Sequence, residues 1–191
     1  MKLFMVRHGP THQKGMVGWT DCPADLSDVE AIGRLRAYLP QSGFLISSDL
    51  SRAITTADAV AQNHNRLPHD PDLREINFGD WEMKTFDQIN ATDPDRIFAF
   101  YDNPGATSAP NGDSWNSLSD RIDRAIDALY HRYVGETMIC VAHYGVILRT
   151  IQRAKSQSAY ETFAQKIDNL SVTTFEVTNT GLDVGAINYC P

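Results

Sequence analysis

The stretch LFMVRHGPT, residues 3–11, changes abruptly from apolar to polar and decides how the rest of the chain is interpreted. Residues 3–6 form a short run without a charge, as expected of a strand buried in a sheet. The next four residues, RHGP, cannot continue a central strand, because a proline has no amide hydrogen for the ladder. The stretch therefore predicts a buried strand that ends at a guanidinium, Arg7, and an imidazole, His8.

Two further apolar runs end in the same way. Residues 44–47 form a second buried strand, and Arg52 lies in the opening turn of the helix predicted after it. Residues 137–142 form a third strand, which ends at His143. Open α/β sheets bind ligands beyond the carboxyl ends of their strands. We therefore expect the two arginines and two histidines that follow these strands to converge.

Apolar residues at helical spacing predict the helices that connect and follow the strands. These helices are expected over about residues 27–39, 50–61 and 117–133, and from about residue 146. Their N-terminal capping groups are expected to be Ser27 with Glu30, Ser48 or Asp49, and Ser117 with Asp120. Buried strands that alternate with helices are typical of an α/β fold.

The end of the chain adds an antiparallel element. Residues 172–177 and 182–187 are apolar runs that flank Thr180 and Gly181, which predicts a hairpin. We therefore expect a three-layer α/β sandwich with a mostly parallel central sheet and helices on both faces. The C-terminal antiparallel hairpin is expected at one edge of that sheet.

Length and composition predict one globular domain over residues 1–191. Five of the nine prolines fall in residues 66–115, where aromatic residues are also frequent. We interpret about 76–115 as a cap-like insertion with short helices. The net charge of −7 disfavours nucleic acid as a partner, because nucleic-acid binding needs a basic face.

The cysteines and the hydropathy bear on compartment and metal. Cys22, Cys140 and Cys190 form no Cys-x-x-Cys pair and are odd in number, which favours a reducing compartment. No Cys/His cluster has the spacing of zinc ligands. The first apolar run is too short for a signal peptide, and no stretch has transmembrane length. The sequence predicts a cytoplasmic protein without a metal or a membrane partner.

The expected group of two arginines, two histidines and helix N-termini suits a phosphate. Arginine presents a fixed fork of donors that matches phosphate oxygens, and helix N-termini add free amides. A neutral imidazole can attack phosphorus and hold the group covalently. The neighbouring arginines stabilise charge on the transferring oxygens and disfavour protonation of the nucleophile.

A leaving alkoxide also needs a proton, and Glu75 in LREINFGDWE, residues 73–82, is the best candidate donor. After the first half-reaction the same carboxylate would draw a proton from water, so that no metal is needed. Glu82 and Asp80 are competing candidates. The alternative is that Glu75 is not the acid and only pairs with Arg74 or another cation.

Four strings together resemble one known family. They are RHGPT (7–11), SSDLSRA (47–53), LRE with GDWE (73–75 and 79–82) and VAHYGV (141–146). Their types and order are similar to those of the histidine phosphatase superfamily, also called phosphoglycerate mutase-like. The resemblance implies that His8 is the nucleophile, that Arg7, Arg52 and His143 hold the phosphoryl group, and that Glu75 is the acid and base. It implies no cofactor.

The resemblance also has a finer part and some departures. FGDWEM, residues 78–83, is similar to a string of α-ribazole phosphate phosphatases. Lys14 stands where many members have an asparagine that touches phosphate, and Tyr144 where a glycine is frequent. Pro10 and Met83 also replace common residues. Lys14 would add a positive charge at the phosphate, and Tyr144 would narrow the mouth of the site.

The expected function is therefore hydrolysis of a small phosphomonoester through a phosphohistidine intermediate, with α-ribazole 5′-phosphate as a candidate substrate. One alternative is phosphoryl transfer of the phosphoglycerate mutase type. Another is a catalytically inactive regulatory protein that only binds phosphate, which Lys14 and Tyr144 would favour. The oligomeric state is not indicated by the sequence.

Overall fold

The computed structural model describes residues 1–191. Strands and helices follow in the order β1 (Lys2–Arg7), α1 (Val29–Tyr38), β2 (Ser42–Ser47), α2 (Ser51–Val60), β3 (Asn63–Arg66), η1 (Pro71–Leu73), η2 (Gly79–Trp81), α3 (Phe86–Asn90), α4 (Pro94–Asp102), α5 (Trp115–Arg132), β4 (Thr137–Ala142), α6 (Tyr144–Lys155), α7 (Ala159–Phe163), β5 (Val172–Val177) and β6 (Leu182–Val184). The two η elements are single turns of 3₁₀ helix.

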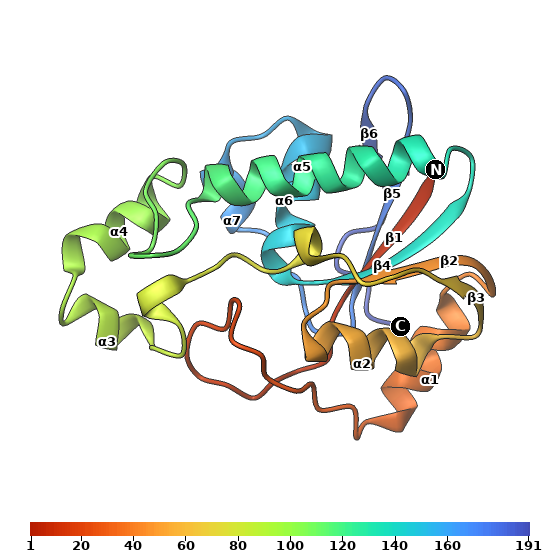
Figure 1. The fold of residues 1–191 in the computed structure, drawn as a ribbon, viewed down its shortest axis with the longest axis horizontal. Helices are drawn as coiled ribbons and strands as arrows, with labels where there is room; N and C mark the ends of the chain where they lie inside the picture. Colours follow the sequence, from red (N-terminus) through yellow and green to blue (C-terminus); the bar gives the residue numbers. More distant parts are fainter.

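All six strands belong to one sheet, in the order β3-β2-β4-β1-β5-β6. β1, β2, β3 and β4 run parallel, and β5 is antiparallel to both of its neighbours, β1 and β6. Figure 1 shows α5 and α6 on one face of this sheet and α1 and α2 on the other. The predicted fold class is confirmed, including the antiparallel C-terminal edge.

Alternation along the strands divides the core between the two faces of the sheet. Leu3 and Met5 of β1 point into the larger apolar cluster, which α5 and α6 cover. Val6 points into the smaller cluster, which contains Leu35 of α1 and Ala57 of α2. Both faces of β1 and β4 are thus buried, which explains why their sequences are continuously apolar.

The segment that carries η2, α3 and α4 lies to one end of the molecule, away from the strands (Figure 1). Its own apolar side chains, Trp81, Ile89, Ile97 and Phe100, are buried and continue the larger cluster. The Trp81 and Phe100 rings meet edge to face, 5.5 Å apart. None of the helices combines the length and the hydropathy that crossing a bilayer requires.

Three elements differ from the predicted ones. β3 was not predicted, because its residues Asn63–Arg66 are all polar; as the edge strand it needs no apolar face. The short helix α7, Ala159–Phe163, was also missed. β6 ends at Val184 rather than at residue 187, so the hairpin is shorter than expected.

The predicted caps of the first two helices are wrong. Asp28, not Ser27, caps α1 and accepts the Ala31 amide. Neither candidate caps α2: Arg74 binds Asp49, and the Ser48 hydroxyl accepts only the Leu50 amide, while the distant Asp21 accepts the first amide of the helix.

The starts of the two later helices also shift. α5 begins at Trp115, where Ser114 and Ser117 form the capping box in place of Ser117 and Asp120. α6 begins at Tyr144, directly after His143, and not at residue 146. Each correction lengthens the helix at its N-terminus.

Thr56 joins the end of β1 to α2 inside the protein. Its hydroxyl donates to the Arg52 carbonyl at 2.7 Å and accepts the Gly9 amide at 3.0 Å. Thr56 has no exposed surface. A buried backbone amide without an acceptor is costly, so this hydroxyl fixes where the chain turns after His8.

We expect Thr56→Val to lower the free energy of unfolding by about 1–3 kcal/mol, because it keeps the shape but leaves the buried Gly9 amide without an acceptor. Urea denaturation measures this change. Thr55→Val is the matched control: Thr55 is exposed on the same helix, and its hydroxyl also bonds a carbonyl four residues earlier, that of Ser51. A control as damaging as Thr56→Val would contradict the assignment.

Candidate active site

The pairing of β1 with β4 brings the two histidines together. The parallel register sets Arg7 opposite Ala142. His8 and His143 are therefore the first residues after two neighbouring strand ends. The His8 amide donates to the Ala142 carbonyl at 3.1 Å, and the ring centroids lie 5.0 Å apart. The chain leaves β1 toward α1 and β4 toward α6, on opposite faces of the sheet (Figure 1). Such a divergence opens the crevice where α/β sheets bind ligands.

One hydrogen bond fixes the tautomer of His8. Its Nδ1 lies 2.6 Å from the Gly9 carbonyl oxygen, which can only accept, so the proton is on Nδ1. Nε2 therefore keeps its lone pair and accepts from Arg52 Nε at 3.3 Å. Burial, and then the charge of Arg52, lower the pKa of His8 to about 3. The imidazole is neutral at physiological pH and presents Nε2 to the site.

Arg52 is completely buried and is held by a loop before α1. Its Nη1 and Nη2 donate to the carbonyls of Thr20 and Gly18 at 3.0 and 2.6 Å. The carboxylate of Glu82 accepts four backbone amides, those of residues 18, 19, 20 and 78. Glu82 thereby fixes the loop that holds Arg52, and it has no free oxygen for proton transfer. Asp80 is exposed and bonds Asn111.

Several buried nitrogen atoms at the site have no partner. Arg7 Nη1 donates to the Ile167 carbonyl at 2.6 Å, while its Nε is buried and unbonded. His143 has no exposed surface, and neither of its ring nitrogens has a partner. Burial is the largest cause that holds the pKa of His143 well below its usual value, and the charge of Arg52 acts in the same direction. Buried polar groups normally find partners, so these nitrogens indicate a site for an acceptor-rich ligand.

Glu75 lies on the N-terminus of α6. Its two oxygens are 3.0 and 3.1 Å from the Gly145 amide, and the Ile76 amide donates to one of them at 2.9 Å. Glu75 is only 7% exposed. A Cβ on Gly145 would collide with this carboxylate, so a larger residue two positions after His143 would displace Glu75 from the α6 N-terminus. The expected alternative of an ion pair between Glu75 and Arg74 is not formed, because Arg74 binds Asp49.

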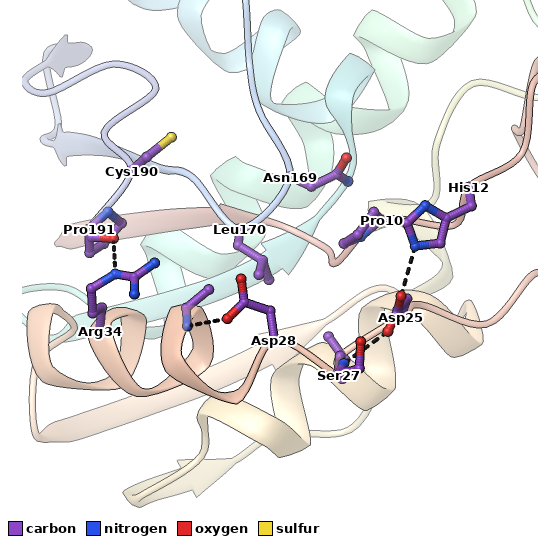
Figure 2. Close-up of a pocket in the computed structure, with 12 residues that line it drawn as sticks. Pro10, His12, Asp25, Ser27, Asp28, Arg34, Asn169, Leu170, Cys190 and Pro191 are labelled. Atoms are coloured by element: carbon purple, nitrogen blue, oxygen red, sulfur yellow. Dashed lines mark hydrogen bonds and ion pairs between the residues drawn. The ribbon is translucent and has the colours of Figure 1, made fainter.

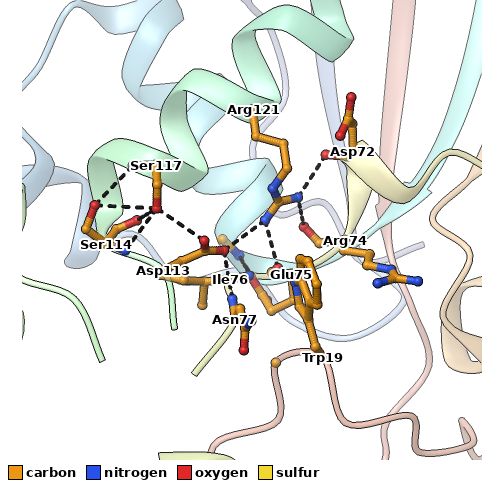
Figure 3. Close-up of polar contacts among 12 residues, drawn as sticks. Trp19, Asp72, Arg74, Glu75, Ile76, Asn77, Asp113, Ser114, Ser117 and Arg121 are labelled. Atoms are coloured by element: carbon orange, nitrogen blue, oxygen red, sulfur yellow. Dashed lines mark hydrogen bonds and ion pairs between the residues drawn. The ribbon is translucent and has the colours of Figure 1, made fainter. Parts of the chain in front are cut away.

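The backbone around Glu75 is held by residues that the sequence did not single out. Arg121 of α5 donates to the carbonyls of Asp72, Arg74 and Glu75 at 2.7–3.0 Å (Figure 3). The Trp19 indole donates to the Glu75 carbonyl at 2.8 Å. Arg121 bonds backbone carbonyls that only the fold brings near it, so no sequence signal was available.

Asn169 is another supporting residue that was missed. Its side-chain amide donates to the His8 carbonyl at 2.8 Å. It precedes β5 and belongs to no recognisable string, so no sequence signal was available. Together with Thr56, which accepts the Gly9 amide, it fixes the backbone that carries His8.

The two specificity candidates are placed differently. Tyr144 donates its hydroxyl to the Gln165 carbonyl at 3.1 Å, and Arg7 Cζ lies 5.3 Å from its ring centroid. It is therefore beside the phosphate candidates. Lys14 is exposed and makes no hydrogen bond or ion pair, so nothing in the structure brings its ammonium to the site.

A separate pocket of about 390 Å³ lies between α1, the loop after β1 and the last residues of the chain (Figure 2). His12 lines it and bonds Asp25 at 2.8 Å. No group of three or more His, Cys, Asp or Glu side chains is arranged to hold a metal ion.

Comparisons with known proteins place the chain in a class of α/β enzymes that contains phosphatases and phosphoglycerate mutases. The sequence profile of the histidine phosphatase superfamily (branch 1) matches residues 3–189. The chain belongs to this family, as its four strings predicted.

Individual relatives support the same placement. Phosphoglycerate mutase-like protein 4 of Arabidopsis thaliana is 28% identical over 185 residues, which are 92% of this chain and 79% of that protein. The adenosylcobalamin/alpha-ribazole phosphatase of Escherichia coli K12 is 27% identical over 175 residues, 88% of this chain and 86% of that one. The solved structure of Bacillus stearothermophilus YhfR superposes with a TM-score of 0.88 at 26% identity, covering 100% of this chain and 98% of that one.

The low pKa of His8 predicts a pH-dependent stability. The folded protein keeps His8 neutral down to about pH 3, whereas an unfolded chain protonates a histidine near about pH 6.5. The unfolded state then binds more protons, so this contribution to stability is lost as pH falls from about 6.5. We expect His8→Gln to flatten the decline of unfolding free energy between about pH 6.5 and 4 by up to about 1.4 kcal/mol per pH unit.

Urea titrations at stepped pH values measure these slopes. His131→Gln, which removes an exposed imidazole that forms no ion pair, is the control and should leave the wild-type slope unchanged. Equal slopes for wild type and His8→Gln would show that His8 is not held neutral.

Proposed function

We propose that the protein is a phosphomonoesterase that carries the phosphoryl group on Nε2 of His8, without a metal or other cofactor. One observation supports this above all: a neutral imidazole whose Nε2 carries no proton lies beside buried nitrogens that have no hydrogen-bond partner, the ring nitrogens of His143 and Arg7 Nε. A tetrahedral anion would supply these acceptors. The same anion would be the electrophile for His8.

The phosphate clamp would use both arginines and His143. Arg7 and Arg52 are each tied at one side to backbone carbonyls, so their guanidinium groups do not have to be ordered when substrate binds. Prepositioned cations in a buried site stabilise charge that develops on the transferring oxygens. The fully buried His143 would add a hydrogen bond.

In the first step, Nε2 of His8 attacks phosphorus, and the bond between phosphorus and the ester oxygen breaks. The protonated carboxyl of Glu75 gives its proton to the departing alkoxide. In the second step, the Glu75 carboxylate takes a proton from water while that water attacks phosphorus. The N–P bond then breaks, its electron pair returns to Nε2, and inorganic phosphate leaves.

The substrate is a small phosphorylated metabolite, and we propose α-ribazole 5′-phosphate as its candidate. A relative from Escherichia coli bears the name adenosylcobalamin/alpha-ribazole phosphatase and matches 88% of this chain. Phosphoryl transfer of the mutase type is the second candidate function, because the relative from Arabidopsis thaliana bears the name phosphoglycerate mutase-like protein 4. A mutase must protect its phosphoenzyme from water, so rapid hydrolysis without an isomerised product would exclude it.

We expect wild type to hydrolyse phosphomonoesters in the presence of a chelator, and His8→Ala to lose about three decades or more of kcat, as for deletion of a covalent nucleophile. Steady-state phosphate release measures this. Protein quenched in alkali should carry an acid-labile phosphoryl group only when His8 is present. Turnover that needs added metal, or His8→Ala near the wild-type rate, would contradict the mechanism. Bound phosphate without any phosphohistidine would instead indicate the regulatory binder.

Glu75→Gln should slow release of a poor leaving group, such as benzyl alcohol, by about 10²–10⁴-fold, and release of 4-nitrophenol far less, because only the former needs a proton. Single-turnover release of the alcohol isolates this first half-reaction. Asp80→Asn, which changes an exposed carboxylate on the neighbouring turn, is the control. Equal slowing for both leaving groups would assign the acid to another residue.

A further inference from the structure

A pocket of about 190 Å³ adjoins Glu75 and Gly145, on the side of the site where a leaving group would depart. Six aromatic side chains line it: Phe78, Phe100, Tyr101, Trp115, Tyr144 and Phe163. Four of them belong to the segment 76–115, which was predicted as a cap-like insertion. The pocket thus lies between that segment and the helices that follow β4.

Five of these rings form a continuous wall. Trp115 and Phe163 meet edge to face at 4.8 Å, and Phe163 contacts Tyr101 at 6.3 Å. Tyr101 meets Phe100 at 5.4 Å, which in turn lies 6.3 Å from Phe78. Such edge and tilted contacts are favourable between aromatic rings and restrict how each ring can turn. The wall is therefore a preformed apolar surface.

The polar ends of two rings point to partners outside the pocket. The Trp115 indole donates to Gln152 Oε1 at 2.9 Å, and the Tyr144 hydroxyl donates to the Gln165 carbonyl at 3.1 Å. Neither glutamine lines the pocket. What these two residues present to a ligand is their aromatic surface and not a hydrogen-bonding group.

The lining contains no lysine, arginine or histidine, and its one ionisable acid is Glu75. A second anionic group on the substrate would have to leave water here without a cation in the lining to pair with it. Leaving groups such as glycerate are therefore disfavoured by charge. A flat uncharged ring would bury apolar area against the wall.

We propose that this pocket binds the leaving group and selects phosphomonoesters whose alcohol carries an uncharged aromatic ring over those that carry a second anion. This inference rests on the proposed phosphatase function and names its substrate class. The charge and shape of this pocket favour aromatic esters over phosphoglycerates as substrates.

The test compares kcat/KM of the wild-type protein for benzyl phosphate, ethyl phosphate and 3-phosphoglycerate. All three are esters of primary alcohols, so they differ mainly in what enters the pocket. We expect benzyl phosphate to exceed ethyl phosphate by about 10–100-fold, the value of burying one ring. 3-Phosphoglycerate should fall below ethyl phosphate.

Variants locate the preference in the wall. Tyr101→Ala and Phe163→Ala should each reduce the benzyl-to-ethyl ratio by several-fold. Tyr101→Arg, which places a cation in the pocket, should raise the relative rate with 3-phosphoglycerate. Phe98→Ala is the matched control, because Phe98 is an exposed ring on α4 that does not line the pocket. Its ratio should equal that of wild type.

A measurement on wild type alone keeps the test valid where a variant does not fold. Benzylphosphonate should inhibit competitively with a Ki about 10–100-fold below that of ethylphosphonate. Hydrolysis of all three esters without an aromatic preference, or with 3-phosphoglycerate preferred, would overturn the inference and leave the phosphatase proposal standing. No hydrolysis of any ester would overturn the phosphatase proposal itself.

Discussion

The parallel pairing of β1 with β4, in the register that sets Arg7 opposite Ala142, is the constraint on which the rest of the structure depends. It makes His8 and His143 neighbours, although 134 positions separate them in the sequence. A slip by one residue would turn each side chain of β1 to the other face of the sheet. Leu3 and Met5 would then leave one core and Val6 the other, so packing of the whole sandwich specifies the geometry of the two imidazoles.

The site brings two buried arginines together in a protein whose net charge is −7. Burying these cations would be costly if they had no hydrogen-bond partners. Backbone carbonyls carry much of this support: Arg52 bonds the loop before α1, and Arg7 bonds the Ile167 carbonyl. The histidines remain uncharged because burial and the two guanidinium groups disfavour a further proton. The arginines thus stay charged and the histidines neutral in the same buried site, because a guanidinium stays protonated where an imidazole does not.

The sequence was most informative where physics leaves few solutions. Apolar runs that stop at Arg7 and His143 predicted the buried strands and the layered α/β fold. They also predicted that the polar residues after these strands converge. Residues such as Arg121 and Asn169 act through backbone carbonyls that become their neighbours only in the fold, so no spacing rule exposes them. Caps were mispredicted for a related reason: Asp49 has the right chemistry for a helix start, but the distant Arg74 competes for it.

The carboxylate of Glu82 holds amides from two distant parts of the chain, the loop at 18–20 and Phe78 at the entrance to the segment bearing α3 and α4. The first of these parts supports Arg52, and Phe78 belongs to the aromatic wall. The α3–α4 segment is therefore coupled through one carboxylate to the loop that holds Arg52. Loss of the acid at position 82 would release the loop that anchors Arg52 and the Phe78 end of the aromatic wall together.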